Sequence, residues 1–238
     1  MSGREHQKRV AAERAVTFVE SGMRLGLGTG STATHVLDVL SEKLRAGSLR
    51  DIAGVPTSRA TADYARTAGI PLLDLDDVQH LDLAIDGADE VDPGLDLIKG
   101  LGGALLWEKI VESAAARFIV VVDDSKLVQR LGEKVPVPVE VVPFGWKTLL
   151  DHFEAAGARP VLRMAGSSPM VTDGGHYIVD CHFAGGLDDA PGTAALLRSR
   201  AGVVETGMFI DMATVVVVAG ADVRVIERTT METTGGVT

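Results

Sequence analysis

The chain has 238 residues, of which 46% are hydrophobic and 24% are charged, values typical of an ordinary globular protein. This length allows one large domain, or a large domain with a smaller one beside it. Acidic residues outnumber basic ones by 33 to 23, which argues against a broad surface for nucleic acid but not against a small phosphate ester bound by one or two local lysines.

The cysteine content and the apolar runs predict a cytoplasmic protein. The single cysteine, Cys181, cannot form an internal disulfide, which fits a reducing compartment. Residues 1–10 are charged and lack the apolar region of a signal peptide. The longest apolar runs, 118–122 and 215–219, are too short to cross a bilayer and are typical of buried strands.

Helical and extended segments alternate through the first half of the chain. In chain order we expect a helix at 4–20, a strand at 25–27, a helix from 31, a strand at 52–55, a helix at 58–68, strands at 72–73 and 81–85, a helix at 104–116 and a strand at 118–122. Ser31 or Thr32 is expected to cap the second helix. Such alternation favours a right-handed, doubly wound α/β sheet.

The pattern becomes less regular near Val135. There we expect a short Val-rich segment between two prolines, a helix at 146–156, strands at 159–164 and 176–183, and a helix at 189–200. These elements predict a smaller α+β domain over 131–205. The run at 214–219 is expected to return to the first sheet, so that the larger domain comprises 1–130 and 206–238, with a frayed tail beyond Arg228.

A glycine-rich segment, Gly26–Thr32, lies between an expected strand and an expected helix. Glycines let a backbone approach a ligand, and the N–H groups at a helix N-terminus favour an anion. The segment is not the dinucleotide fingerprint, because Ser31 stands in place of the third glycine, and no G-K-[ST] follows as in a P-loop. An ordinary tight turn before a capped helix is the alternative interpretation.

An acidic segment, Asp86–Glu90, follows the strand expected at 81–85. In an open α/β sheet, ligands bind outside the carboxyl ends of the strands, and acids packed there repel one another until one takes up a proton. A solvated acidic turn is the alternative. A calcium loop is less well supported, because the required spacing of acids and glycine is missing.

The third candidate segment, Lys99–Gly103, leads into the helix that contains Glu108. Helical geometry places Glu108 on a mostly apolar face, where burial would raise its pKa and suit it to general acid or base chemistry. Lys99 could balance this charge and stabilise an oxyanion. The alternative is that Glu108 merely pairs with a basic neighbour.

Other residues carry weaker signals. Cys181 and His182 are adjacent on an expected strand and so point to opposite faces, and the histidine spacings predict no metal site. Lys126 follows another strand end and could reach a phosphate, although an exposed turn lysine fits equally well. Trp107 favours packing or a subunit contact over a cofactor platform.

The three main segments each follow a strand, so they can converge on one crevice. Together they supply anion-binding N–H groups, several acids, a lysine and a carboxylate on an apolar face, with no cradle for a cofactor and no metal cage. Proton transfer on a small anionic substrate is the chemistry that fits this set.

The ordered motifs resemble those of type A ribose-5-phosphate isomerases from about residue 8 to residue 220. They are G-L-G-T-G-S-T (26–32), D-G-A-D-E (86–90), K-G-L-G-G-A-L (99–105), E-K-I (108–110), D-D-S-K (123–126), P-V-E-V-V-P (138–143) and V-T-D-G-G (171–175). Each motif alone is modest, whereas the ordered set is specific. The resemblance implies a Rossmann-like doubly wound sheet with a smaller inserted α+β domain, assembled as a homodimer or homotetramer.

The resemblance also implies interconversion of ribose 5-phosphate and ribulose 5-phosphate in the non-oxidative pentose phosphate pathway, without metal or organic cofactor. Glu108 would be the base, working through a cis-enediolate, and Lys99 would stabilise the oxyanion. Asp86 and Asp89 would bind sugar hydroxyls, with Asp86 also assisting ring opening or proton movement between oxygens. The residues implied to bind the substrate and its phosphate are Thr29, Gly30, Ser31, Thr32, Gly87, Ala88, Gly100, Leu101, Gly102, Lys126 and Lys8.

Two departures from the family pattern concern the pocket wall or a subunit contact. Trp107 is bulkier than expected before the base, and Leu101 interrupts a glycine run.

Two other functions remain as alternatives: an acyl-CoA transferase with a carboxylate nucleophile, and a sugar-phosphate-sensing domain. The second would need a helix-turn-helix and a basic surface, whereas here one short helix leads straight into Gly26.

Overall fold

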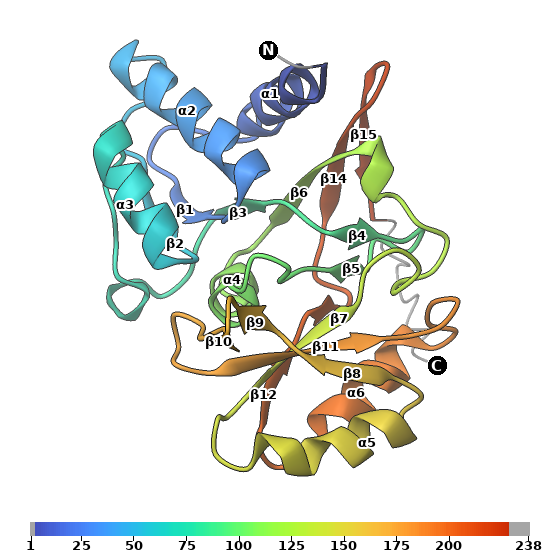
Figure 1. The fold of residues 1–238 in the computed structure, drawn as a ribbon. Coiled ribbons are helices and arrows are strands. Elements are labelled where there is room, and N and C mark those ends of the chain that lie inside the picture. Colours follow the sequence, from blue (N-terminus) through green and yellow to red (C-terminus); the bar gives the residue numbers. More distant parts are fainter. Residues whose placement is uncertain (1–2, 229–238) are drawn as a thin grey trace, which may run out of the picture.

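The computed structural model describes residues 3–228 and contains a six-stranded sheet with strand order β15-β14-β6-β3-β1-β2 (Figure 1). Its strands are β1 (Arg24–Leu27), β2 (Ala53–Pro56), β3 (Leu83–Asp86), β6 (Phe118–Asp123), β14 (Val215–Ala219) and β15 (Val223–Glu227). All pairings are parallel except that of β14 with β15. Parallel strands bring their carboxyl ends to one edge, which positions the loops that follow them.

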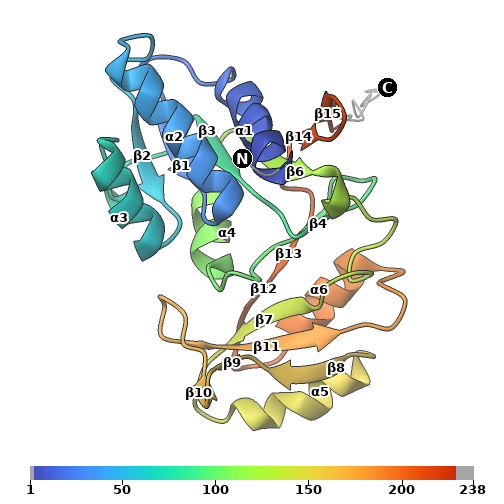
Figure 2. The same cartoon turned by 45° about the horizontal axis from the view of Figure 1, so that its top comes forward.

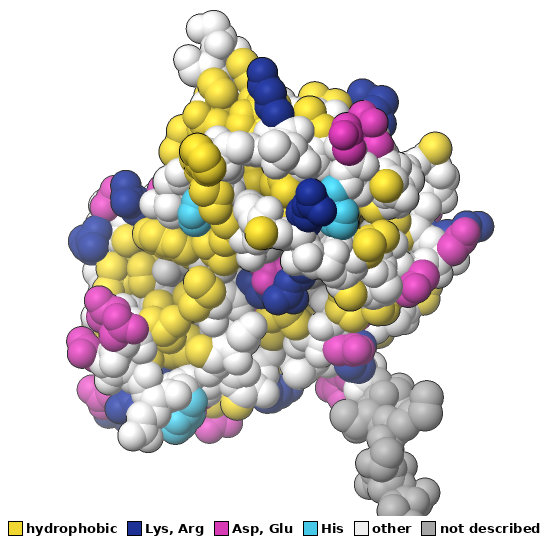
Figure 3. Space-filling model, turned by 90° about the horizontal axis from the view of Figure 1, so that it is seen from below, with side chains coloured by type: hydrophobic (Ala, Val, Ile, Leu, Met, Phe, Trp, Pro, Cys, Tyr) yellow, Lys and Arg dark blue, Asp and Glu magenta, His cyan; other side chains and the backbone are white. Residues whose placement is uncertain are grey.

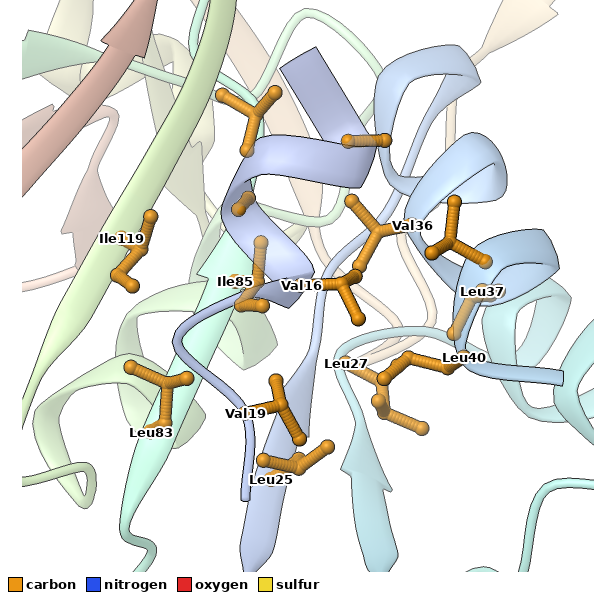
Figure 4. Close-up of a cluster of buried hydrophobic side chains, with 14 of the residues drawn as sticks. Val16, Val19, Leu25, Leu27, Val36, Leu37, Leu40, Leu83, Ile85 and Ile119 are labelled. Carbon is orange, nitrogen blue, oxygen red and sulfur yellow. The ribbon is translucent and has the colours of Figure 1, made fainter. Parts of the chain in front are cut away.

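Helices cover both faces of this sheet. They are α1 (Gly3–Val16), α2 (Ser31–Arg45), α3 (Arg59–Ala68) and α4 (Leu105–Ser113). The core under α1 and α2 is aliphatic: Figure 4 shows Val16, Val36 and Leu40 facing Leu27 and Ile85 of the sheet. On α4, Val111 packs against the sheet at Gly26, where a β-carbon would lie 2.9 Å from the Val111 Cγ1.

A second sheet of four antiparallel strands, in the order β12-β7-β11-β8, lies below the first in Figure 1. Its elements are β7 (Val137–Val141), β8 (Arg159–Leu162), β11 (Tyr177–His182), β12 (Val203–Thr206), α5 (Leu150–Ala155) and α6 (Ala190–Arg198), with the hairpin β9 (Met164–Ala165) and β10 (Ser168–Pro169) beside them. Both Figure 1 and Figure 2 place α4 between the two sheets.

A small sheet of three strands, β13-β5-β4, lies between the larger sheets. Its strands are β4 (Glu90–Val91), β5 (Leu97–Ile98) and β13 (Met208–Phe209). Glu90 is fully buried, and its carboxylate accepts hydrogen bonds from the backbone N–H groups of Gly132 (2.6 Å), Lys134 (2.6 Å) and Val135 (2.9 Å). One side chain therefore fixes the backbone that leads into the second sheet.

The surface carries charges of both signs. On the face seen from below, Lys and Arg side chains are scattered among acidic and apolar ones, so this face has no broad basic surface (Figure 3). Within residues 3–228, no helix has the length and apolar character needed to cross a membrane.

The structure confirms the doubly wound α/β sheet, the smaller α+β part and the return of 215–219 to the first sheet. The division into 1–130 with 206–238 and 131–205 stays a prediction. The expected strand at 72–73 is wrong: Leu72 makes only an isolated bridge with Gly54. The expected helix at 146–156 begins as a short 3-10 helix, Trp146–Leu149, before α5. The frayed tail expected beyond Arg228 lies outside the residues described.

We expect Glu90→Ala to destabilise the fold, because it leaves three backbone donors without their carboxylate. A buried donor without a partner costs about 1–3 kcal/mol. Urea unfolding measures the loss, with the exposed Glu20→Ala as control. Equal stability of the two variants would contradict the role given to Glu90.

Candidate active site

A cleft of about 330 Å³ opens at the carboxyl ends of β1, β3 and β6. The residues that line it come from the three segments singled out in the sequence, from α1 and from the loop after β6. They are Lys8, Thr29, Gly30, Ser31, Thr32, Gly87, Ala88, Asp89, Lys99, Gly100, Gly102, Glu108, Asp123, Ser125 and Lys126. Segments far apart in the chain therefore form one site, as the strand order requires.

The N-terminus of α2 is capped by Gly30, not by Ser31 or Thr32 as the sequence predicts. Gly30 has φ 102°, a left-handed conformation that glycine adopts without strain, and no side chain makes a capping hydrogen bond. Ser31 is instead the first residue of α2, and its Oγ accepts a hydrogen bond from the Lys8 Nζ at 3.0 Å. The first N–H groups of α2 thus face the cleft without a side-chain cap, in the manner of an anion-binding site.

Thr29 is held by a cluster of hydroxyl groups behind the loop. Its Oγ1 lies 2.7 Å from the Thr57 Oγ1, 2.9 Å from the Ser58 Oγ and 2.9 Å from the Thr61 Oγ1. Thr57 and Thr61 in turn donate to the backbone carbonyls of Leu27 and Gly28. The side chain of Thr29 therefore fixes the shape of the loop that lines this part of the cleft.

Asp86 ends β3 beneath the cleft floor and is 1% exposed. Its Oδ1 accepts hydrogen bonds from the N–H groups of Thr29 (3.0 Å) and Gly87 (2.7 Å), and its Oδ2 lies 2.9 Å from the Lys99 Nζ. A β-carbon on Gly28 would lie 2.2 Å from this carboxylate, so only glycine leaves room for it. Asp86 is thus fixed as the anionic partner of Lys99.

Lys99 is 2% exposed and follows β5. Its Nζ donates to the Gly87 carbonyl at 2.6 Å and lies 3.6 Å from the Glu108 Oε2 and 3.3 Å from the Glu112 Oε1. Burial alone would lower the pKa of Lys99, but the surrounding carboxylates outweigh it and raise that pKa above its ordinary value. The ammonium therefore stays charged.

Glu108 lies in the first turn of α4, is 5% exposed and lines the cleft. Burial raises the pKa of Glu108 from 4.5 to about 8, helped by the negative charges of Asp86 and Asp89 and opposed by Lys99. Such a carboxyl gains and loses its proton near neutral pH, which is the property that a general base requires. Glu108 shares the buried face of α4 with Leu105 and Val111, as the sequence predicts, but also with Glu112.

Asp89 and the loop 99–103 form a further wall of the cleft. The Asp89 Oδ2 accepts a hydrogen bond from the N–H of Leu101 at 3.0 Å, which orients the glycine-rich loop. The Leu101 side chain is 38% exposed and does not line the cleft. Trp107 lies partly buried, among residues that line other pockets beside α4.

All but two of the predicted site residues line the cleft. The exceptions are Asp86, which lies beneath it, and Leu101, which contributes its backbone only. Sequence reasoning missed the direct participation of Asp123 and Ser125 in the lining and the buried Glu112 next to Lys99. The D-D-S-K motif contains the first two, whereas Glu112 has no local signal.

The part of the chain that is described, 3–228, contains no group of three or more His, Cys, Asp or Glu side chains arranged to hold a metal ion. Cys181 and His182 lie on β11 as expected, with Cys181 fully buried and His182 only partly so. Burial raises the pKa of the Cys181 thiol to about 12, so this residue is an inert member of the second core.

The family model of ribose 5-phosphate isomerase A (phosphoriboisomerase A) matches residues 53–223. The chain belongs to this family. Among curated ribose-5-phosphate isomerase A family members, the protein from Roseiflexus castenholzii is 54% identical over 216 residues, covering 90% of this chain and 92% of its own. A probable ribose-5-phosphate isomerase 2 from Arabidopsis thaliana is 51% identical, covering 90% and 83% of the two chains.

Solved structures of the family share the fold of this isomerase. A D-ribose-5-phosphate isomerase in complex with phospho-erythronic acid superposes with a TM-score of 0.92 at 44% identity, covering 94% of this chain and 99% of that one. The ribose 5-phosphate isomerase A from Methanocaldococcus jannaschii gives 0.89 at 38% identity, with coverages of 94% and 100%. The Rossmann-like sheet with its smaller α+β part is therefore the fold of the family.

The stability of this isomerase should depend on pH through Glu108. Because the pKa of Glu108 is about 8 when folded and 4.5 ordinarily, its contribution is complete below pH 4.5 and is lost as the pH rises through about 8. We expect Glu108→Gln, which stays neutral, to gain free energy of unfolding relative to the unsubstituted chain across this window. Urea unfolding at a series of pH values measures the gap, and Glu20→Gln should show none. A difference in free energy of unfolding that stays the same at every pH would contradict the raised pKa of Glu108.

Proposed function

We propose that this chain interconverts ribose 5-phosphate and ribulose 5-phosphate, with Glu108 as the base that moves a proton between C2 and C1. The observation that supports this most is the pair of Glu108 and Lys99 at one end of a polar cleft, with 3.6 Å between carboxylate and ammonium. A base beside a fixed positive charge suits removal of a proton next to a carbonyl. The place of this reaction in the non-oxidative pentose phosphate pathway follows from the substrates.

The proposed reaction proceeds through a cis-enediolate. Ionised Glu108 removes the proton from C2 of the open-chain aldose, and the electron pair of the C–H bond moves toward the C1 oxygen. The same carboxyl then returns the proton to C1, while a proton moves between the two oxygens, so the product is an isomer and no redox partner is consumed. The raised pKa of Glu108 supports this double use, because a base of pKa about 8 also releases its proton readily.

Lys99 is the group that we assign to the developing oxyanion. Its ammonium is held by Asp86 and by the Gly87 carbonyl, so it needs no reorganisation as negative charge forms. Asp89, at the wall, is assigned to the sugar hydroxyls. For Asp86, direct contact with hydroxyls and help in ring opening stay predictions, since its carboxylate contacts Thr29, Gly87 and Lys99.

The opposite end of the cleft is assigned to the phosphate. It combines the N-terminus of α2, which has no side-chain cap, with Lys8, Ser31 and Lys126. Helix N-termini and lysines are both favourable partners of a phosphate. The phospho-erythronic acid of the related structure carries a phosphate and a carboxylate, two charges that fit the two ends of this cleft.

The other two functions have less support. An acyl-CoA transferase would need a channel for a long cofactor, and a sensing domain would not need a base with a raised pKa. Assembly as a homodimer or homotetramer, and location in the cytoplasm, stay predictions.

A coupled assay of ketose formation from ribose 5-phosphate, run with and without EDTA, tests the proposal. Absence of turnover in both would refute the proposal, and loss of turnover only with EDTA would refute the metal-free mechanism.

We expect Glu108→Gln to lower kcat by about 10²- to 10⁴-fold, the range typical of general base catalysis. The amide keeps the size of the side chain and cannot accept the proton. Circular dichroism would verify that the variant folds, and Glu20→Gln is the matched control on the surface. Turnover by Glu108→Gln close to that of the unsubstituted enzyme would remove Glu108 from the mechanism.

We expect Lys126→Ala to raise KM roughly tenfold and to change kcat less, because one charge-assisted hydrogen bond to the phosphate is lost. Steady-state kinetics with ribose 5-phosphate measures both constants. The control is Lys147→Ala, an exposed lysine that does not line the cleft. A fall in kcat with KM unchanged would place Lys126 at the reacting carbons instead of at the phosphate.

A further inference from the structure

Glu112 lies beneath the cleft and has no part in the mechanism above. It follows Glu108 by one turn of α4, is 3% exposed and does not line the cleft. Its Oε1 lies 3.3 Å from the Nζ of Lys99. Since burying an ionised carboxylate is costly unless it is well paired, a buried acid at this position calls for a physical explanation.

The cluster holds more acids than one ammonium can balance. The Lys99 Nζ faces Asp86 at 2.9 Å, Glu112 at 3.3 Å and Glu108 at 3.6 Å, and none of these side chains is more than 7% exposed. With all three carboxyls ionised, the buried cluster would carry two negative charges in excess. A dry site avoids this by keeping protons on some of its carboxyls.

The hydrogen bonds indicate which carboxyl keeps a proton. Asp86 accepts hydrogen bonds from two backbone N–H groups, and its Oδ2 lies 2.9 Å from the Lys99 Nζ, so its oxygens already have donors. Within residues 3–228, neither oxygen of Glu112 receives a hydrogen bond from a donor. Burial, with the charges of Asp86 and Glu108, outweighs Lys99 and raises the pKa of Glu112 well above 4.5.

The remaining charged neighbour of Glu112 does not change this conclusion. Lys109, on the same helix, is engaged by the Glu205 carboxylate at 3.0 Å and by the carbonyls of Thr206 and Met208, each at 2.7 Å. Its ammonium therefore already has three acceptors and is not the hydrogen-bonding partner of Glu112. A protonated Glu112 can instead share a hydrogen bond with Asp86, which is one of the interactions that favour its neutral form.

We propose that Glu112 is a positioning residue that stays protonated throughout the reaction and donates a hydrogen bond to Asp86, so that the Asp86–Lys99 pair stays fixed under Glu108. This rests on the proposed function, because Glu108 is there the base that exchanges a proton with the substrate. Glu112 thereby places no second exchanging proton beside Glu108.

The pH dependence of kcat/KM for ribose 5-phosphate tests this in Glu112→Gln. Gln is also neutral and can also donate to Asp86, so we expect the acid limb to stay where it is in the unsubstituted enzyme. If Glu112 were ionised, its replacement would remove a negative charge beside Glu108, lower the pKa of Glu108 and move the limb to lower pH. Such a displacement would overturn the proposal.

Glu112→Leu separates positioning from mere filling of space. It is neutral and similar in size but cannot donate to Asp86, so we expect kcat to fall roughly 10- to 100-fold with KM nearly unchanged. The comparison is made between variants of equal thermal stability. Equal kcat for the Leu and Gln variants would overturn the positioning role.

Infrared difference spectroscopy gives a readout independent of turnover. Above the pKa of Glu108, about 8, we expect the band of a protonated carboxyl in the unsubstituted enzyme and its loss in Glu112→Gln. If Glu112→Gln fails to fold, the same band should persist in Glu108→Gln. Absence of the band would overturn the proposal for Glu112. Absence of turnover by the unsubstituted enzyme would instead refute the proposed function, and the band would still report whether Glu112 is protonated.

Discussion

The positive charge of Lys99 is the constraint on which the site depends. An ammonium that is 2% exposed is stable only beside anions, and the nearby carboxyls can be buried only because that ammonium is there. Neither group could be placed in this position alone. The rings of Phe118 and Phe209 lie 5.8 and 5.5 Å from the Lys99 Nζ and add apolar cover on the side away from the cleft carboxylates. Electrostatic interactions there are consequently stronger than they would be in solution.

The rest of the sheet edge is shaped to suit this pair. Gly28 leaves the space that the Asp86 carboxylate occupies, and the hydroxyl cluster around Thr29 fixes the backbone that donates to the same carboxylate. The loop around Thr29 is thus held rigid by hydrogen bonds without being buried. The two ends of the cleft differ in their polar groups. One end has the buried Lys99 and the titrating Glu108, and the other has backbone donors with Lys8 and Lys126.

Local patterns allowed most of the fold to be predicted, because strands such as 118–122 are apolar throughout and helices such as 31–45 have one apolar face. Most of the cleft could also be predicted, since the segments after β1, β3 and β6 follow parallel strands, whereas 99–103 follows β5, which pairs only with antiparallel strands of the small sheet. The errors have physical causes. Ser31 looks like a cap, but a residue with φ 102° precedes it and only glycine adopts that angle readily. Glu112 looks like a surface residue of a helix, and its buried partners come from β3 and from the end of β5, which no local window contains.

Asp89 and Glu90 are adjacent in the chain and serve two different parts of the molecule. Asp89 holds the Leu101 N–H at the wall of the cleft, while Glu90 is anchored in the backbone at 132–135 that leads into the second sheet. A displacement of the second sheet would therefore be transmitted through a single peptide link to the loop that carries Lys99. The smaller part of the molecule is thus mechanically coupled to the reacting end of the cleft, although none of the residues that line the cleft comes from 131–205.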